Sequence, residues 1–186
     1  MRVSVAQIRS LGLDWPTDRI GPDGSVDLAA IANLVDAEFA TAERVYFGTL
    51  GAAGSDEARE RYFGLRELGD HTAVVRALLT AIGGRSIGTG PIPRSTIEAL
   101  QLPCSALLAK KLVAVGDEVD LVNTMELLVR NYRYYQREYD GLNDQRRRYG
   151  ASRADISDRW DELSSGMSDN DTAIRELSAI LVAVCR

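Results

Sequence analysis

Residues 118–149 read EVDLVNTMELLVRNYRYYQREYDGLNDQRRRY, and this stretch decides the fold class that the sequence predicts. Large apolar and aromatic residues recur in it at alternating steps of three and four. Such spacing aligns side chains along one face of an α-helix. The face comprises Leu121, Met125, Leu128, Tyr132, Tyr135, Tyr139, Leu142, Arg146 and Tyr149. We therefore expect one long amphipathic helix over 118–149.

The expected length of this helix bears on function. At 1.5 Å per residue it would span roughly 48 Å, against about 30 Å for the diameter of a small domain. A helix of that length must project from its domain or form a spine. Its apolar face then needs to be covered by the rest of the chain or by another chain. Self-association is the expectation that follows.

Helical periodicity, capping residues and glycine stops divide the rest of the chain into further helices. The expected helices cover residues 4–11, 25–47, 55–68, 70–82, 95–102, 103–115, 152–165 and 168–184. Gly69, Gly116 and Gly166 are each expected to end a helix. Val3 to Val5 could form a short strand, but one strand cannot form a sheet. The sequence thus predicts an all-α bundle of about seven or eight helices, without an internal repeat of fixed period.

Residues 83–94 (GGRSIGTGPIPR) are the clearest interruption, because their glycines and prolines cannot continue a helix. We expect a single helical domain, or two subdomains (1–82 and 95–186) joined by this loop. A phosphate-binding loop would need a preceding strand and a lysine followed by Ser or Thr. Neither is found here, so a linker or a loop that contacts a neighbour is preferred.

Composition and charge argue against several functional classes. The net charge of −5 argues against a general nucleic-acid binder, which usually has an excess of Lys and Arg. No basic segment followed by an apolar run marks a signal peptide, and no apolar stretch approaches the length of a membrane span. Cys104 and Cys185 fit two small buried residues in a reducing compartment. We expect a cytoplasmic protein, or a component of a particle assembled in the cytoplasm.

No catalytic, cofactor-binding or metal-binding set is predicted. His71 is the only histidine, and a structural or exposed histidine near a helix start is the simplest interpretation. Glu-x-x-His, a twelve-residue calcium loop and zinc-ligand spacing are all missing. The acidic clusters, for example Asp117 to Asp120 and Asp169 to Asp171, are expected to cap helices and complement their dipoles.

The segment 130–148 (RNYRYYQREYDGLNDQRRR) mixes arginine and tyrosine, which are enriched at protein–protein hot spots. Tyr132, Tyr135 and Tyr139 fall on the apolar face, and most arginines fall off it. Packing within the chain and an interface with another protein both fit this division, whereas base stacking on nucleic acid fits it less well. The interface candidates are Tyr132, Arg133, Tyr135, Arg137, Tyr139, Arg146, Arg147 and Tyr149.

The predicted function is a non-enzymatic structural or assembly protein that acts through helix-mediated contacts, with itself or within a larger assembly. The opening short helix, loop and acid-capped helix, over about the first 46 residues, resemble head–tail adaptor proteins of tailed phages. The resemblance implies a viral or phage particle component and assigns no residue a role. Two alternatives remain: an accessory or regulatory module that docks on a larger complex, and an enzyme with a non-standard site.

Overall fold

A computed structural model describes the chain except residues 51–53, 84, 86–89, 150–152 and 186, with side chains also left undescribed at 144–156. Seven α-helices lie within the described part, and 74% of the residues are helical. This confirms the predicted all-α, multi-helix fold class. The chain divides into two compact units, Met1–Arg76 and Ala77–Arg186, which are described separately.

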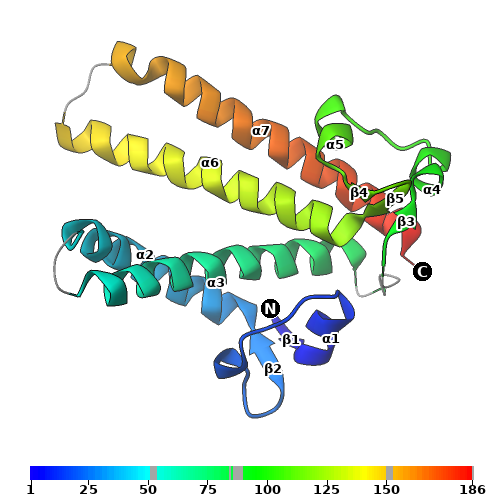
Figure 1. Ribbon diagram of the computed structural model, residues 1–186, viewed down its shortest axis with the longest axis horizontal. Helices are drawn as coiled ribbons and strands as arrows, with labels where there is room; N and C mark the ends of the chain where they lie inside the picture. Colours follow the sequence, from blue (N-terminus) through cyan, green and yellow to red (C-terminus); the bar gives the residue numbers. More distant parts are fainter. Residues whose placement is uncertain (51–53, 84, 86–89, 150–152, 186) are drawn as a thin grey trace. The chain divides into compact units, whose positions relative to one another are not determined.

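Unit 1 begins with two short strands around a small helix and continues into two long helices (Figure 1). Its elements are β1 (Arg2–Ser4), α1 (Val5–Ser10), the 3₁₀ helix η1 (Thr17–Arg19), β2 (Ser25–Asp27), α2 (Leu28–Gly48) and α3 (Ser55–Ile82), of which the last crosses into unit 2. β1 pairs antiparallel with β2, with Val3 opposite Val26. Ile8, Val26 and Leu28 are fully buried and form the core beside this pair.

Local hydrogen bonds explain where the first helices begin. Ser4 and Gln7 form the predicted capping box, because the Ser4 side chain accepts from the Gln7 N–H and the Gln7 side chain accepts from the Ser4 N–H. Asp27 caps α2 by accepting from the N–H groups of Ala29 and Ala30, at 3.1 and 3.2 Å.

Three predictions in unit 1 are wrong. The helix expected over 25–47 begins at Leu28, because Ser25–Asp27 form β2. The strand at Val3 was expected to lack a partner, but it pairs with β2.

Gly69 does not stop a helix, since α3 continues from Ser55 to Ile82. A glycine inside a helix costs only about 1 kcal/mol relative to alanine. Burial of Leu68, Val74 and Val75 on either side of it outweighs that cost. Asp70 is accordingly buried within the helix instead of capping a new one.

Unit 2 has a small sheet, two short helices and a pair of long helices (Figure 1). Its elements are β3 (Ile92–Pro93), α4 (Arg94–Ala99), α5 (Ala106–Lys111), β4 (Val113–Val115), β5 (Glu118–Asp120), α6 (Leu121–Tyr149) and α7 (Arg153–Val184). The strands pair antiparallel in the order β3-β5-β4, and Val119 at the centre is fully buried.

The expected helix over 103–115 is therefore wrong beyond Lys111, and the long helix starts at Leu121 instead of Glu118. Val113, Val115 and Val119 are β-branched and favour strands here. Gly116 supplies the positive φ of +63° for the turn between β4 and β5. Asp120, not Asp117, then starts α6, because its Oδ1 accepts from the Asn123 N–H at 2.9 Å.

α6 and α7 form a close antiparallel pair (Figure 1). The expected helix end at Gly166 is also wrong, since α7 runs unbroken from Arg153 to Val184. The glycine has a packing role instead: a Cβ placed there would lie 2.6 Å from Cε1 of Tyr135. Gly166 thus lets the Tyr135 ring approach the backbone of α7.

The two units repeat one order of elements: a strand, a short helix, a second strand, and two long helices. In each unit the strand before the first long helix ends in Val-Asp and the helix begins with Leu, at 26–28 and at 119–121. In both places the valine is buried in the sheet, the aspartate caps the first long helix, and the leucine enters the core. Unit 2 adds α5 and β4 between its strands, so the recurrence has no fixed period.

Candidate functional site

Two of the tyrosines predicted as interface residues, Tyr135 and Tyr139, lie against the partner helix of their own hairpin. Tyr135 packs on Gly166, and Tyr139 stacks on Trp160 with ring centroids 6.1 Å apart. Tyr132, Tyr135 and Tyr139 are all half-buried. Of the two interpretations the sequence left open, this placement favours packing within the chain for Tyr135 and Tyr139.

The basic residues of α6 are only in part within the described side chains. Arg133 and Arg137 are half-buried, and each already interacts with another group of the chain. Beside them, the Nε of Arg130 lies 2.8 Å from Oε1 of Glu126, one turn earlier. The side chains of Arg146, Arg147 and Tyr149 lie outside the described residues, as do residues 84 and 86–89 of the predicted glycine-rich linker.

An aromatic cluster at the free end of the α2–α3 pair was not predicted as a site. It comprises Phe39, Tyr46, Phe47, Tyr62 and Phe63. Tyr46 and Tyr62 stack at 5.1 Å with 10° between their planes. Phe47 and Phe63 each contact Tyr62 edge-on, at 5.9 and 5.1 Å. These contacts fix the rings relative to one another.

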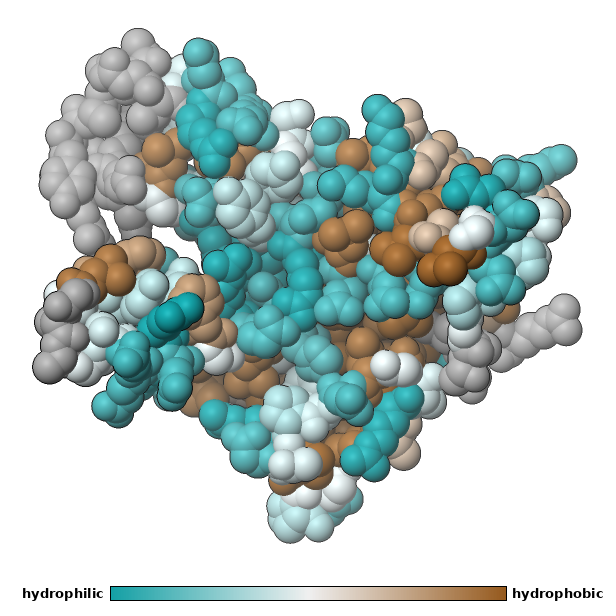
Figure 2. Space-filling view, in the orientation of Figure 1, coloured by the Kyte–Doolittle hydropathy of each residue, from teal (hydrophilic) through white to brown (hydrophobic). Residues whose placement is uncertain are grey.

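Part of this cluster faces solvent. Phe47 is 57% exposed and Phe63 is 41% exposed, and the neighbouring Val45 and Leu50 are 47% and 59% exposed. We call these four residues the apolar tip. Figure 2 shows hydrophobic surface at this end of the α2–α3 pair, at the left of the view. Large apolar side chains that gather in solvent at one end of a helix pair make this end a candidate contact site.

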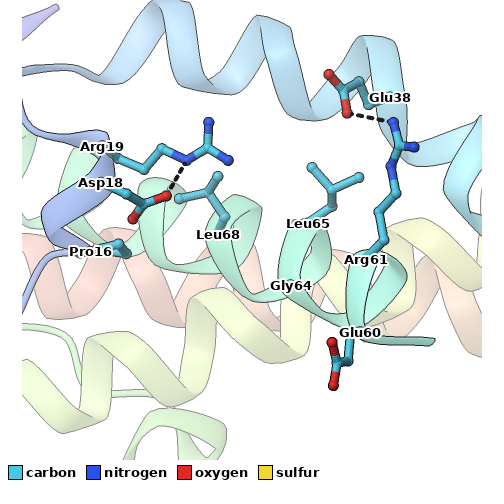
Figure 3. A pocket seen from close by; sticks show the side chains of 9 residues that line it. All are labelled: Pro16, Asp18, Arg19, Glu38, Glu60, Arg61, Gly64, Leu65 and Leu68. Atoms are coloured by element: carbon cyan, nitrogen blue, oxygen red, sulfur yellow. Dashed lines mark hydrogen bonds and ion pairs between the residues drawn. The ribbon is translucent and has the colours of Figure 1, made fainter. Parts of the chain in front are cut away.

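A second surface feature of unit 1 is a cavity of about 380 Å³ between α2, α3 and η1. Figure 3 shows two ion pairs on either side of it, with Leu65 and Leu68 between them. Arg61 of α3 donates to Glu38 of α2 at 3.0 Å. Arg19 of η1 lies 3.2 Å from Asp18. Glu60 points away from both pairs (Figure 3).

A second, more apolar hollow of about 450 Å³ lies beside the first on α3, and the two share Pro16, Gly64 and Leu68 as lining residues. Trp15 and His71 line this second hollow. The Nε2 of His71 lies 2.6 Å from the backbone oxygen of Asp14, and its ring lies 5.1 Å from that of Trp15. His71 thereby attaches the loop to α3, which is a structural role. We call the combined feature the α3 groove.

The described side chains that could act as nucleophiles or metal ligands do not form a cluster. Cys104 is exposed, contrary to expectation, whereas Cys185 is buried. Burial raises the pKa of both thiols, and the Glu176 carboxylate raises that of Cys104 further, so neither favours the reactive thiolate. Among the described residues, no cluster of three His, Cys, Asp or Glu side chains could hold a metal ion.

No described helix is both long enough and apolar enough to cross a membrane. Comparison of the chain with protein-family models, with curated proteins and with solved structures gave no match. The candidate functional features of the chain are the apolar tip and the α3 groove, both in unit 1. Both need residues distant in sequence, so periodicity alone could not have found them.

Proposed function

We propose that this protein is a non-enzymatic assembly protein that acts through helix-mediated protein–protein contacts, with a second copy of itself as the first candidate partner. The observation that carries the proposal is the apolar tip of the α2–α3 pair. Four of its large hydrophobic side chains are between 41% and 59% exposed. Phenylalanine, present at the tip as Phe47 and Phe63, is enriched at protein–protein interfaces.

The ring contacts beneath the tip support the proposal. Tyr62 is buried and contacts Tyr46, Phe47 and Phe63. Rings that are already held in place lose little side-chain entropy when a partner binds. An ordered but exposed apolar surface is therefore suited to association. A particle component such as a head–tail adaptor or connector is the finer proposal, and it rests on the order of elements in the first 46 residues alone.

The test is the absolute molar mass in solution, measured by light scattering behind size exclusion at low and high salt. We expect an oligomer at both salt concentrations, because apolar contacts are not screened by ions. The double variant Phe47→Ser and Leu50→Ser should shift it to monomer without loss of helical circular dichroism. Leu127→Ser is the matched control, since Leu127 is 37% exposed but belongs to α6.

Three results would count against the proposal. An oligomer that survives the double variant would exclude the tip as the contact. A monomeric wild-type chain would contradict self-assembly, and the tip would then be tested as the contact of an accessory module on another protein. Dissociation only at high salt would place the contact on charged residues instead.

A further inference from the structure

Charged side chains surround the apolar tip, and they differ between its two helices. On the α2 side, Glu43 and Arg44 lie one turn before Phe47, and their charges cancel. Arg44 is exposed and shares a helix face with Phe47, three residues later. It forms no ion pair with any residue that the structure describes. The α2 side of the tip therefore presents an exposed guanidinium group beside exposed apolar surface.

The α3 side of the tip is acidic. The first two turns of α3 expose three carboxylates, from Asp56, Glu57 and Glu60, against one guanidinium group, from Arg59. The Arg59 guanidinium lies over the Phe63 ring, 5.9 Å from its centroid. Asp56 shares a helix face with Phe63, seven residues later. Over these four charges the α3 side has a net charge of −2, whereas the α2 side is neutral.

Two identical tips can meet around a two-fold axis in two ways. In a like-with-like contact, α2 lies on α2 and α3 lies on α3. In a crossed contact, α2 of each copy lies on α3 of the other. The like-with-like contact sets two acidic α3 ends against each other, which is unfavourable. The crossed contact keeps these ends apart and sets Arg44 of each copy near the carboxylates of the other.

The ends of the helices favour the same contact. At the tip, α2 ends at Gly48 and α3 begins at Ser55. The C-terminal end of a helix carries a partial negative charge, and the N-terminal end carries a partial positive charge. The crossed contact brings opposite ends together, whereas the like-with-like contact brings equal ends together.

We infer that the apolar tip closes a two-fold dimer of this chain through the crossed contact, with Arg44 of each protomer facing Asp56 and Glu57 of the other. Two-fold dimers are the commonest closed form of self-association, and they use one self-complementary surface. The exposed apolar side chains supply the buried surface, and the charges select the orientation. This inference rests on the proposed function, because it specifies how a second copy binds to the tip.

Charge reversal on one side of the tip tests the crossed contact. Arg44→Glu places like charges across the contact, and each pair occurs twice in a two-fold dimer. We expect the dissociation constant to rise roughly tenfold at low ionic strength, measured by sedimentation equilibrium. Asp56→Arg combined with Glu57→Arg should raise it similarly. Lys110→Glu is the matched control, because it makes the same charge change as Arg44→Glu on an exposed residue of unit 2.

A swapped chain that carries all three tip substitutions should recover the wild-type dissociation constant, since the attraction returns with its signs exchanged. It should not form mixed dimers with the wild-type chain, because like charges would then face each other on both sides. Native mass spectrometry of the swapped chain mixed with isotope-labelled wild type counts the mixed dimers. A like-with-like contact predicts the opposite, namely little effect of one-sided reversal and abundant mixed dimers. Circular dichroism checks that every variant folds.

Three results would overturn the inference: a wild-type oligomer larger than a dimer, a wild-type dissociation constant for both one-sided variants, or abundant mixed dimers. Each leaves the proposed function standing where the double variant Phe47→Ser and Leu50→Ser still gives monomers. A monomeric wild-type chain would overturn both, so the two failures are distinguishable.

Discussion

The two pairs of long helices each carry a glycine in the second helix, and they use it differently. In unit 2, Gly166 of α7 lies under the ring of Tyr135, and the pair closes on itself. In unit 1, Gly64 of α3 has no atom within 4 Å of its Cβ position, and it lies in a groove. The aromatic residues follow the same division. Tyr139 and Trp160 stack inside the unit 2 pair, whereas Phe47 and Phe63 of unit 1 face solvent.

The two units share an order of secondary-structure elements, but this difference indicates that they have different roles. In unit 2, Gly166, Tyr135 and Tyr139 serve internal packing. In unit 1, Gly64 is open, and Phe47 and Phe63 are exposed. Contacts with other molecules are therefore expected from unit 1, although the tyrosine-rich helix of unit 2 is the more conspicuous sequence.

The largest expected effect comes from closing the space under Tyr135. Gly166→Ala places a Cβ 2.6 Å from the Tyr135 ring, so the ring or the helix must shift. Overpacking of this kind costs about 1–3 kcal/mol. Urea unfolding, followed through Trp160 fluorescence, measures the loss. Combining it with Tyr135→Ala should cost less than the sum of the two single changes. A wild-type stability for Gly166→Ala would show that the close contact is not required.

Gly64→Ala should have the opposite sign. Its Cβ meets nothing, so the replacement should raise stability by about 1 kcal/mol through helix propensity. Urea unfolding followed through Trp15 fluorescence reports the change in unit 1. Gly141→Ala, followed through Trp160, is the matched case in unit 2 and should give a similar gain. A loss of stability at Gly64 alone would mean that the groove is closed in solution, and it would remove the contrast with Gly166.

The smallest effect concerns the cap of α2. The N–H groups of Ala30 and Ala29 donate to Asp27 and hold the pKa of its carboxyl below the ordinary value of 3.8. Ionised Asp27 therefore stabilises the fold above the unfolded-state pKa, and this contribution is lost as the pH falls through the lower, folded-state pKa. Asp27→Asn should reduce the acid dependence of unit 1 unfolding, measured from pH 5 downward by Trp15 fluorescence. An unchanged pH profile would contradict this role.

The sequence predicted most helices because each needs only a local pattern. The face through Leu121, Met125 and Leu128 is buried as the periodicity indicated. The errors lie where tertiary contacts override a local signal. Gly69 and Gly166 look like helix ends, yet burial around one and Tyr135 against the other keep both inside helices. The valines around Gly116 fit a helix face as well as a hairpin, and pairing with β5 decides for the hairpin.

The groove and the apolar tip could not be predicted from sequence periodicity, because both depend on contacts between residues that are distant in sequence. The groove forms because the loop that carries Trp15 lies on α3, attached through His71 and Asp14, which are 57 positions apart. The tip needs Phe47 and Tyr62 from two helices to meet. Neither contact produces a recognisable spacing of residues in the sequence. The tyrosines and arginines of the long helix were predicted as interface residues because they lie close together in one segment of the sequence.

The boundary between the two units falls between Arg76 and Ala77, inside α3. The connection there is a turn of helix, across which each N–H donates to a carbonyl four residues earlier. Cutting the chain at this point would strand about four donors on one fragment and four acceptors on the other. Melting of one unit would likewise remove the helical nucleus from which the other unit's first turn propagates. The two halves are thus joined thermodynamically as well as covalently, and neither can be excised as an independent piece without rebuilding a helix end.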